Sequence, residues 1–585
     1  MSKNPNFQLY EVEPVSSIRN LLEIAEKEVA DHIAFRYRVR EEIRDVTYHD
    51  FIRDVNALGS VMRTMGIGEG EHICQIGENS YNWIVVYLSV LAGNRVFVPI
   101  DKELPEADIC HIATHGEGSV LFYTAKYEEI VKRNADTTFA DFKYFVHMET
   151  AVEEDYVPEN ARFRSFRQML SDGYRLLDDG YADYIQEKVD PAKLKMIVYT
   201  SGTTGIAKGV MLSEHNLISI VYYGLQVSTV YDVGLSVLPY HHTYEAVAGL
   251  LVSLHHHSTI CINENLKTVM KNLATYKPDY IYLVPAFAEE FYRRIWQNAK
   301  KTGKEAGLKA LIKTSNGMRK VGIDARKKMF ATIHEAFGGN LKKIVCGGAP
   351  IRPEIGEFFD AIGIDLINGY GITECSPLVS VNPDTFNDCR TAGLPLPCCT
   401  VKIDDPTPEG IGEICVKGDI VMLGYYKEPE KTAEVLSEDG WFRTGDYGKI
   451  NEKGQLIITG RKKNIIVLSN GKNIYPEEIE NYIMNVPYIK EVVVYGLKNE
   501  YGDETKLCAE VFLNAEKLEE LHITDPVESL KKDIAKACEH LPMYKKVAQI
   551  VIRAKEFDKN SSNKIKRQNI GKEQPESAAQ AETNA

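Results

Sequence analysis

Several features that would indicate a secreted, membrane-spanning or zinc-binding protein are missing from this chain of 585 residues. The first residues, MSKNPNFQLYEVEP, contain no apolar core of the kind that signal peptides have. The longest apolar run, Trp83 to Ile100, is interrupted by Asn94 and Arg95, so we expect a helix followed by a strand rather than a membrane span. The 11 cysteines show no spacing typical of a zinc site or a disulfide framework. These absences predict a reduced, cytoplasmic setting.

The chain also has fewer basic residues than acidic ones. The chain has 69 Lys and Arg residues against 83 Asp and Glu residues, which gives a net charge of −14. Because an acidic surface repels phosphate backbones, we expect no nucleic-acid partner. The hydrophobic fraction of 44% is typical of a soluble globular protein, and 585 residues suffice for two or more cores. The composition does not determine the oligomeric state.

Strands alternate with helices in the N-terminal part of the chain. Amphipathic helices are predicted at Ser17 to Val29 and after Thr47, which forms a capping pattern with Asp50. Strands are predicted at His72 to Ile76 and Val96 to Ile100, on either side of another helix. This alternation favours an α/β fold with mostly parallel sheets.

A domain boundary is predicted near Gly460. Residues 1–460 would form a large, multi-lobed N-terminal domain, and residues 461–570 a small α+β domain. The helices of the small domain are predicted at Pro476 to Met484 and Val527 to Leu541. The last residues, 571–585, are polar, and we expect them to be disordered.

The stretch Tyr199 to Leu212, YTSGTTGIAKGVML, is the clearest candidate for a binding site. Two apolar runs predict strands, and a loop of hydroxyls and glycines with one lysine lies between them. Glycines let several backbone N–H groups point at one centre, and such a concavity binds anions. The candidate phosphate ligands are Thr200, Ser201, Gly202, Thr203, Thr204, Gly205 and Lys208.

This loop differs from the Walker pattern, which has four residues between its glycines and continues into a helix. Here two residues separate Gly202 from Gly205, and a strand follows. A flexible Ser/Thr/Gly loop would explain the composition. The order of the residues, however, closely resembles the phosphate-binding loop of the adenylate-forming superfamily, which includes acyl-CoA synthetases, luciferases and peptide-synthetase adenylation domains.

The second motif is LPYHHTYE, from Leu238 to Glu245. By itself it is a strand end followed by polar residues, and a histidine pair is more often structural than catalytic. In the superfamily, a motif of this form lines the acyl end of the site. The resemblance implies that His242 contacts the substrate carboxylate or controls access to it.

The third motif combines GGAP, from Gly347 to Pro350, with NGYGITE, from Asn368 to Glu374. An ordinary Gly-rich turn before a helix would be the simpler explanation. The resemblance implies that Thr373 contacts the α-phosphate and that Glu374, a hard oxygen donor, binds Mg²⁺. It also implies a nucleotide site in which Gly348, Ala349 and Tyr370 frame the adenine, beside Asn368, Gly369 and Gly371.

Two further motifs are WFRTGD, which ends at Asp446, and GRKK, which ends at Lys463. Each alone would be read as surface charge. A carboxylate can accept hydrogen bonds from both hydroxyls of a ribose. The resemblance implies that Asp446 binds the ribose, that Arg461 is its partner, and that Lys463 is the hinge of a mobile small domain.

The small domain carries two more motifs. SNGKNIYPEEIE, from Ser469 to Glu480, is a turn before a well-capped helix, and in the superfamily this loop shapes the tunnel for the thiol. NSSNKIKR, which ends at Arg567, contains the position of the superfamily's catalytic lysine, here Lys564. Asn563 stands where glycine is usual, and asparagine tolerates left-handed backbone better than most residues.

Three consecutive histidines, His255 to His257, suggest metal binding at first sight. If they lie on a strand, His255 and His257 share a face and His256 points away. No third ligand at a fixed spacing accompanies them. We therefore predict no transition-metal site.

The resemblance extends in sequence order from Ser17 to Arg567 and is closest to the long-chain fatty acyl-CoA synthetases. It implies an enzyme that uses ATP and Mg²⁺ to convert a fatty acid to an acyl-adenylate, and then transfers the acyl group to coenzyme A as co-substrate. An acyl-(acyl-carrier-protein) ligase, an aryl- or medium-chain acid–CoA ligase and a luciferase-like oxygenase would share the first step. A non-catalytic nucleotide-binding scaffold is disfavoured by the presence of Lys208, Glu374 and Lys564.

One segment, residues 293–328, has a charge balance opposite to that of the whole chain. It contains 12 Lys and Arg residues and two acidic residues, Glu305 and Asp324. Solvated helix faces would explain this pattern. Peripheral contact with an anionic membrane, or with the phosphates of coenzyme A, would explain it too.

Overall fold

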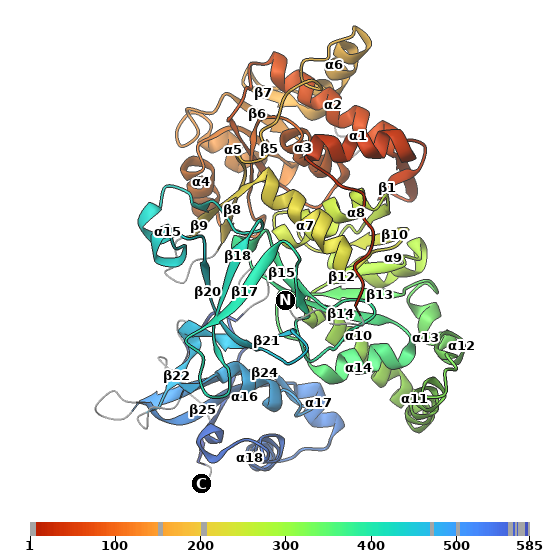
Figure 1. Cartoon of the computed structure of the whole chain (residues 1–585), viewed down its shortest axis with the longest axis vertical. Helices are drawn as coiled ribbons and strands as arrows, with labels where there is room; N and C mark the ends of the chain where they lie inside the picture. The colour runs from red at the N-terminus through yellow and green to blue at the C-terminus, as the bar shows by residue number, and fades with distance from the viewer. Residues whose placement is uncertain are drawn as a thin grey trace. The chain divides into compact units, whose positions relative to one another are not determined.

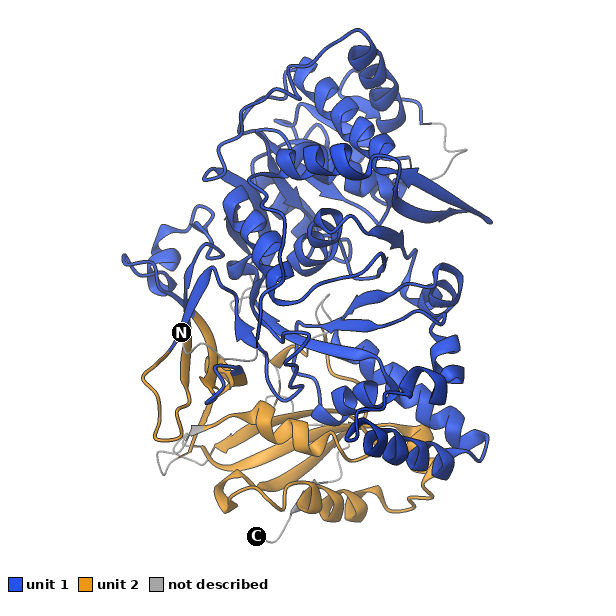
Figure 2. Ribbon diagram, turned by 45° about the vertical axis from the view of Figure 1, so that its right-hand side comes forward, with its two compact units in different colours: residues 1–402, 415–443, 451–456 blue, residues 403–414, 444–450, 457–585 orange. Residues whose placement is uncertain are grey.

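The chain forms two compact units (Figure 2). The computed structural model describes residues 7–149, 156–200, 207–468, 473–498, 504–559, 565–567, 570 and 580–582. Unit 1 comprises residues 1–402, 415–443 and 451–456, and unit 2 comprises residues 403–414, 444–450 and 457–585. The long segment of unit 2 begins close to the predicted boundary, but unit 2 also takes two earlier segments from the range 1–460.

Unit 1 contains an eight-stranded sheet in the order β19-β9-β8-β4-β3-β5-β6-β7 (Figure 1). The strands from β8 to β7 in this order are parallel, whereas β9 and β19 run antiparallel to their neighbours. The predicted strands at 72–76 and 96–100 are confirmed. The strands are β3 (His72–Ile76), β4 (Val96–Pro99), β5 (Gly118–Tyr123), β6 (Tyr144–His147), β7 (Phe163–Ser165), β8 (Leu194–Thr200), β9 (Lys208–Ser213) and β19 (Gly424–Tyr425).

Unit 1 also contains a nine-stranded sheet in the order β16-β15-β14-β13-β12-β10-β11-β1-β2. Its central strands are parallel, and antiparallel strands lie at both edges. The predicted α/β class with mostly parallel sheets is confirmed. The strands are β1 (Ile33–Val39), β2 (Glu42–Thr47), β10 (Val233–Ser236), β11 (Thr259–Ile262), β12 (Tyr280–Leu283), β13 (Lys343–Cys346), β14 (Asp365–Gly371), β15 (Leu378–Val381) and β16 (Leu394–Pro395).

The first helices begin where the sequence predicts. The Ser17 hydroxyl accepts the N–H of Asn20, and the Thr47 hydroxyl accepts the N–H of Asp50, so both helices have side-chain caps. The described helices of unit 1 are α1 (Ile18–Val29), α2 (Tyr48–Thr64), α3 (Tyr81–Leu91), α4 (Glu106–His115), α5 (Glu128–Asn134), α6 (Phe166–Asp178), α7 (Glu214–Val227), α8 (Val252–His255), α9 (Val269–Tyr276), α10 (Pro285–Lys301), α11 (Glu305–Arg319), α12 (Arg326–Met329), α13 (Ala331–Ala336), α14 (Pro353–Ile362) and α15 (Pro429–Val435).

The histidine run lies at the end of a helix, so the premise that it lies on a strand is wrong. His255 is the last residue of α8, and its Nε2 lies 2.9 Å from the carbonyl oxygen of Glu13. The helix continues from the π-helical segment Tyr244–Leu251, whose apolar residues are buried. Burial of this segment decides the local structure. Among the described residues, no group of histidines, cysteines and carboxylates has the arrangement of a metal site.

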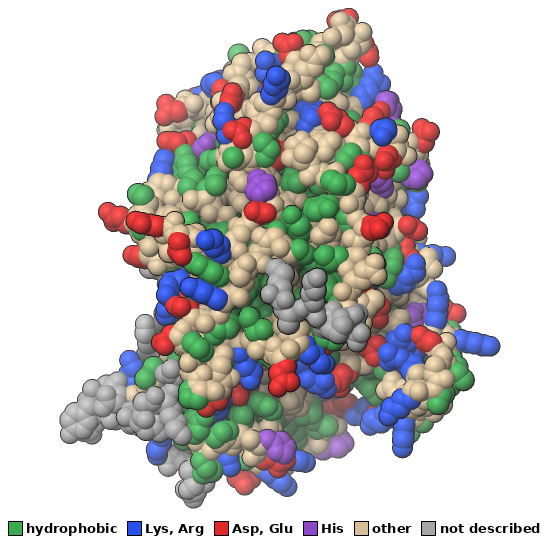
Figure 3. All heavy atoms as spheres, viewed as in Figure 1, with side chains coloured by type: hydrophobic (Ala, Val, Ile, Leu, Met, Phe, Trp, Pro, Cys, Tyr) green, Lys and Arg blue, Asp and Glu red, His purple; other side chains and the backbone are tan. Residues whose placement is uncertain are grey.

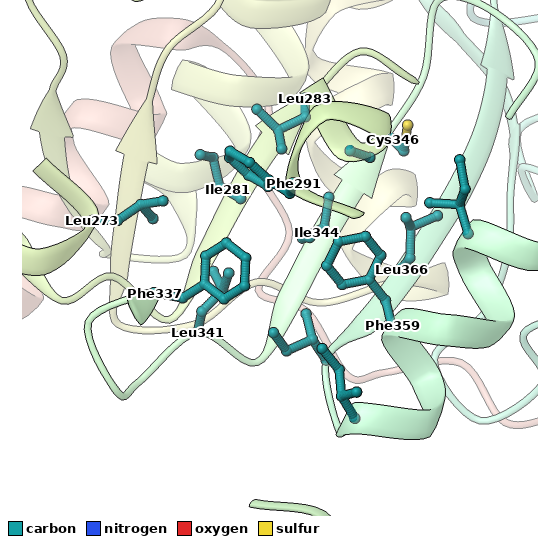
Figure 4. Packing of buried hydrophobic residues seen from close by; sticks show 14 of the residues in the cluster. Leu273, Ile281, Leu283, Phe291, Phe337, Leu341, Ile344, Cys346, Phe359 and Leu366 are labelled. Carbon is teal, nitrogen blue, oxygen red and sulfur yellow. The ribbon is translucent and has the colours of Figure 1, made fainter. Parts of the chain in front are cut away.

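The nine-stranded sheet is packed against helices by a large hydrophobic cluster (Figure 4). Strands β12, β13 and β14 contribute residues to it, as do α9, α10 and α14. Truncating one of its large side chains to alanine typically costs about 2–5 kcal/mol of stability. The labelled members are Leu273, Ile281, Leu283, Phe291, Phe337, Leu341, Ile344, Cys346, Phe359 and Leu366.

Unit 2 has its own core of aliphatic residues, formed by two helices and a sheet in the order β24-β25-β26-β27. The two predicted helices of the small domain are present. Its elements are α16 (Pro476–Ile483), α17 (Ala515–Glu520), α18 (Pro526–Ala537), β22 (Ile466–Val467), β23 (Asn473–Ile474), β24 (Ile489–Lys498), β25 (Glu504–Leu513), β26 (Val547–Arg553) and β27 (Gln580–Glu582).

Strand β27 departs from the prediction of disorder for 571–585. Its three residues pair antiparallel with β26, because the outer edge of β26 offers unpaired backbone groups that composition does not reveal. Four more strands contribute residues to both units: β17 (Cys399–Asp404), β18 (Gly412–Gly418), β20 (Phe442–Ile450) and β21 (Leu456–Arg461). Among the described residues, no helix combines the length and apolar character that a bilayer span requires.

Candidate active site

The β8–β9 hairpin holds the two described ends of the candidate phosphate loop. Thr200 and Lys208 are direct partners in this antiparallel pair, so the loop leaves and re-enters the sheet at one place. Ser201, Gly202, Thr203, Thr204 and Gly205 lie outside the described residues. The hairpin therefore fixes the position of the lysine relative to the start of the loop.

Lys208 and Glu374 are joined by a tyrosine that the sequence did not single out. The Lys208 ammonium lies 4.7 Å from the centre of the Tyr425 ring, a cation–π contact. The Tyr425 hydroxyl donates a hydrogen bond to Glu374 Oε1 over 3.0 Å. Glu374 follows Thr373 in the 3₁₀ turn Thr373–Cys375, and its carbonyl accepts the N–H of Met422. The structure thus gathers a cation, a phenol and a carboxylate around one point.

The NGYG residues form the end of β14, an inner strand of the nine-stranded sheet. The Asn368 amide donates to the carbonyl of Thr391 over 3.0 Å, and Tyr370 is buried. Gly371 must be glycine, since an added Cβ would lie 1.8 Å from the carbonyl oxygen of Pro377. This close approach places Thr373 and Glu374 immediately beyond the strand end.

The GGAP residues follow β13, the parallel neighbour of β14. Cys346 is the register partner of Asn368, so the two motifs leave the sheet at the same edge. Gly348 has φ +85°, a left-handed conformation that favours glycine, and Gly348 and Ala349 are exposed. Tyr244 supports this turn: its hydroxyl donates to the carbonyl of Val345 over 3.0 Å. The exposed backbone here therefore follows a strand next to the one that carries Tyr370.

The histidine motif forms a tight turn before the π-helical segment. The carbonyl of His242 accepts the N–H groups of Glu245 and Ala246, and the rings of His241 and His242 lie 4.2 Å apart. His241 is buried with its Nε2 3.3 Å from Asp101 Oδ1. Burial, together with the charge of His242, lowers the pKa of His241 to about 3. His241 is therefore neutral at pH 7, and His242 is the more exposed of the two.

Glu245 is a fully buried carboxyl group at the start of the π-helical segment. Its Oε1 accepts the hydroxyl of Ser236 over 2.5 Å, and the Ser236 hydroxyl also lies 3.1 Å from that of Tyr240. Burial raises the pKa of Glu245 to about 8. The carboxyl group is therefore mostly protonated at pH 7. Its hydrogen bond with Ser236 connects the histidine motif to the end of β10. The Glu245 carboxyl group has room because residue 249 is glycine. A Cβ added at Gly249 would lie 2.9 Å from the carboxyl carbon of Glu245.

The ribose-site candidates lie together in unit 2. Asp446 is buried, and its Oδ1 lies 2.7 Å from Nε of Arg461. Lys463 follows in the 3₁₀ turn Lys462–Asn464, and its pKa is lowered by burial and by the charges of Arg461 and Arg567. Two candidate sets therefore emerge, one in each unit. Lys564 and the loop residues 469–472 lie outside the described residues.

Two residues that contact the site motifs, Tyr425 and Tyr244, have no role that the sequence predicts. Tyr425 occurs in GYYKEPE, where no spacing links it to Lys208 or Glu374, and it reaches both only because β19 pairs with β9. Tyr244 was visible within the HHTYE motif. Its contact with the GGAP turn depends on how the π-helical segment packs on the sheet.

Two family models match the sequence. A model described as "AMP-binding enzyme" matches residues 22–426, and one described as "AMP-binding enzyme C-terminal domain" matches residues 463–577. The chain belongs to the AMP-binding enzyme family. It is thus an adenylate-forming superfamily member, as its motifs predict, and its similarity to long-chain acyl-CoA synthetases is shown by curated relatives.

Those relatives are 28–29% identical to this AMP-binding enzyme over the aligned residues. It is 28% identical over 481 residues to fatty acyl-CoA synthetase A of Dictyostelium discoideum, covering 78% of this chain and 70% of that protein. It is 28% identical over 502 residues to long-chain-fatty-acid–CoA ligase FadD15 of Mycobacterium tuberculosis, covering 80% and 78%. A chloroplastic long-chain-fatty-acid–[acyl-carrier-protein] ligase of Arabidopsis thaliana is also 28% identical, over 560 residues, covering 83% and 75%.

Solved structures share the fold. The anthranilate CoA ligase AuaEII in complex with anthranoyl-AMP has a TM-score of 0.72 at 17% identity, covering 97% of each chain. The A-PCP didomain of a carboxylic acid reductase from Segniliparus rugosus in complex with AMP has a TM-score of 0.77 at 19% identity, covering 95% of this chain and 80% of that one. At these identities the likeness establishes the fold of this AMP-binding enzyme.

Proposed function

We propose that this chain is a long-chain fatty acid–CoA ligase that forms AMP and pyrophosphate from ATP. The observation that carries the proposal is the cluster of Lys208, Tyr425 and Glu374, in which one tyrosine contacts both the lysine that follows the candidate phosphate loop and the carboxylate that follows β14. It combines a cation with a carboxylate, the pair of groups that a polyphosphate with its magnesium ion requires. Family membership and the long-chain relatives support the reaction and the acid.

In the first step, a carboxylate oxygen of the fatty acid attacks the α-phosphorus of ATP. The new O–P bond forms as the bond to pyrophosphate breaks, and the product is an acyl-adenylate. Lys208 and the loop from Ser201 to Gly205 would bind the phosphates, and Thr373 would donate to the α-phosphate. Lys564 would stabilise the negative charge on the reacting oxygens, and His242 would contact the carboxylate or control its entry.

Glu374 fits the role of magnesium ligand. Its carboxylate is only partly buried, follows the end of β14, and accepts a hydrogen bond from the Tyr425 hydroxyl. When bound, Mg²⁺ neutralises part of the phosphate charge. Adenine would lie on Gly348, Ala349 and Tyr370, next to Asn368, Gly369 and Gly371, and Asp446 with Arg461 would bind the ribose.

In the second step, the thiol of coenzyme A attacks the acyl carbon, the thioester bond forms, and AMP leaves with the carbon–oxygen bond electrons. Lys564 and the loop from Ser469 to Pro476 both follow Lys463 in the chain, and they serve different steps. We infer that residues beyond about 460 rotate about Lys463 between the two steps, so that each element enters the site in turn.

The test is AMP formation from ATP and Mg²⁺ with straight-chain acids from acetate to stearate and with aromatic acids, with and without coenzyme A. Thioester formation with an optimum among long chains is expected. Adenylate formation without transfer to coenzyme A, but with transfer to an acyl-carrier protein, would favour the carrier-protein ligase instead. An optimum at short or aromatic acids would contradict the long-chain assignment, and no AMP with any acid would contradict the ligase proposal itself.

A further inference from the structure

The connection between α11 and α12, residues 320–325, exposes two aliphatic side chains at its tip. Val321 is 73% exposed and Ile323 is 52% exposed. Neither belongs to the hydrophobic cluster that holds the neighbouring Leu308 and Phe330. Folding therefore does not account for them. Solvent-exposed Val and Ile at one turn form an apolar tip.

The backbone of this apolar tip satisfies its own hydrogen bonds. Gly322, with φ +81°, donates its N–H to the carbonyl of Arg319, and Ile323 donates to that of Met318. This is the pattern that closes a helix end without outside partners. Because these N–H groups are already bonded, moving the tip into a less polar phase leaves fewer of them unsatisfied.

Basic residues precede and follow the apolar tip in the chain. Arg319 and Arg326 are held by Asp360, and Arg326 is also held by Asp324. The exposed lysines around these pairs are Lys313, Lys320, Lys327 and Lys328. Figure 3 shows Lys and Arg side chains gathered over the α11–α12 part of the molecule, with hydrophobic side chains beside them. An excess of positive charge therefore faces solvent at this tip, although the chain as a whole carries −14.

We propose that the apolar tip and its lysines bind the surface of an anionic lipid bilayer. Lysines attract acidic headgroups, and aliphatic side chains between them enter the headgroup boundary. Nucleic acid is the weaker candidate, since residues 302–329 contain no aromatic side chain on which bases could stack. The proposal does not rest on the proposed function, because bilayer binding requires neither ATP nor an acid.

The first test is sedimentation of the full chain with vesicles of phosphatidylcholine alone and of phosphatidylcholine with phosphatidylglycerol, at low and at high salt. Binding is expected only to the anionic vesicles and should weaken with salt, because the attraction is screened. Equal binding to both vesicle types, or binding that salt does not weaken, would overturn the proposal. A short DNA duplex that binds more tightly than the vesicles, through the same lysines, would overturn it in favour of nucleic acid.

Charge reversal then locates the surface. The triple variant Lys320→Glu, Lys327→Glu and Lys328→Glu should bind anionic vesicles about 100-fold more weakly, since each basic residue near a membrane contributes roughly a fivefold factor. The matched control reverses three exposed lysines elsewhere, Lys27, Lys188 and Lys532, with the same change in net charge. An equal loss in both triple variants would show an effect of net charge alone and would contradict the proposed surface.

Polar substitution tests the aliphatic contact. The double variant Val321→Ser and Ile323→Ser should weaken binding roughly tenfold, through the apolar area that no longer leaves water. Its control is Val157→Ser with Leu266→Ser, two residues that are 78% and 59% exposed but lie outside the basic segment 313–328. Because all four residues are exposed, the fold should survive, which a thermal melt verifies. Binding by the first double variant at the level of the control would refute insertion of the apolar tip.

Discussion

Two carboxylates of the candidate site, Glu374 in unit 1 and Asp446 in unit 2, are held in different ways. Glu374 accepts a hydrogen bond from the neutral hydroxyl of Tyr425, whereas the buried Asp446 lies 2.7 Å from the guanidinium of Arg461. A phenol orients a carboxylate and leaves its charge in place. An arginine orients it and balances its charge. The first arrangement suits a cation ligand, and the second suits a fixed acceptor for hydroxyl groups.

Replacing Glu374 with Gln should have the largest effect on AMP formation. The amide oxygen can still accept the hydroxyl of Tyr425, but the negative charge is gone. We expect AMP formation to fall about 10²- to 10³-fold and to require more Mg²⁺. The exposed Glu430→Gln variant is the control. An unchanged Mg²⁺ requirement would show that Glu374 is not a magnesium ligand.

Replacing Asp446 with Asn should act on ATP binding and leave the Mg²⁺ dependence alone. The amide keeps one acceptor but cannot balance Arg461, so we expect KM for ATP to rise about 10- to 100-fold, the range for a hydrogen bond to a charged group. Steady-state kinetics with ATP, and with ATP that lacks the ribose 2′-hydroxyl, check this. The ribose role would be wrong if removal of that hydroxyl cost both proteins the same factor.

Replacing Lys463 with Pro tests whether this residue is a hinge for the part of unit 2 that follows it. Proline restricts the backbone at the proposed hinge, so adenylate formation should be spared and thioester formation should fall about tenfold. Each half-reaction is measured separately, by pyrophosphate exchange and by transfer from preformed acyl-adenylate. Equal losses in both steps would count against a hinge at this residue.

Replacing Tyr425 with Phe tests whether the tyrosine hydroxyl orients Glu374. The ring stays beside Lys208 while the hydroxyl is lost, so we expect AMP formation to decrease by about three- to tenfold, because one hydrogen bond that orients the carboxylate is lost while its charge remains. The neighbouring Tyr426→Phe variant, whose hydroxyl contacts Glu117 instead, is the matched control. A similar decrease in both variants would rule out a specific role for Tyr425.

Replacing Glu245 with Gln should change the pH dependence of stability with the smallest effect on catalysis. The folded protein holds a proton on Glu245 up to a pKa of about 8, whereas an unfolded chain releases it near the ordinary value of 4.5. Wild-type stability should therefore fall between these pH values and level off above about pH 8. Glutamine does not titrate, so its stability relative to wild type should rise across this window by roughly 5 kcal/mol, because a difference of one pKa unit is worth about 1.4 kcal/mol. Urea unfolding at several pH values measures this difference, and a constant offset would contradict it.

Local sequence pattern was enough to predict the fold class, the first capped helices and the order of the nucleotide motifs. Ser17 and Thr47 cap helices, and residues 72–76 form a strand, because capping and side-chain periodicity act over a few residues. The motifs were equally visible, since the candidate phosphate loop and NGYGITE are each continuous in the chain.

Features that depend on contacts between residues distant in the sequence could not be predicted from local pattern. Tyr425 lies 51 residues from Glu374 in sequence, and it joins that carboxylate to Lys208 because β19 pairs with β9. The place of Asp446 in unit 2 and the helical conformation of His255 also depend on contacts between residues that are distant in the sequence. The raised pKa of Glu245 likewise requires burial from every side. Local pattern specifies which groups are present, and packing specifies which of them meet and how strongly water is excluded.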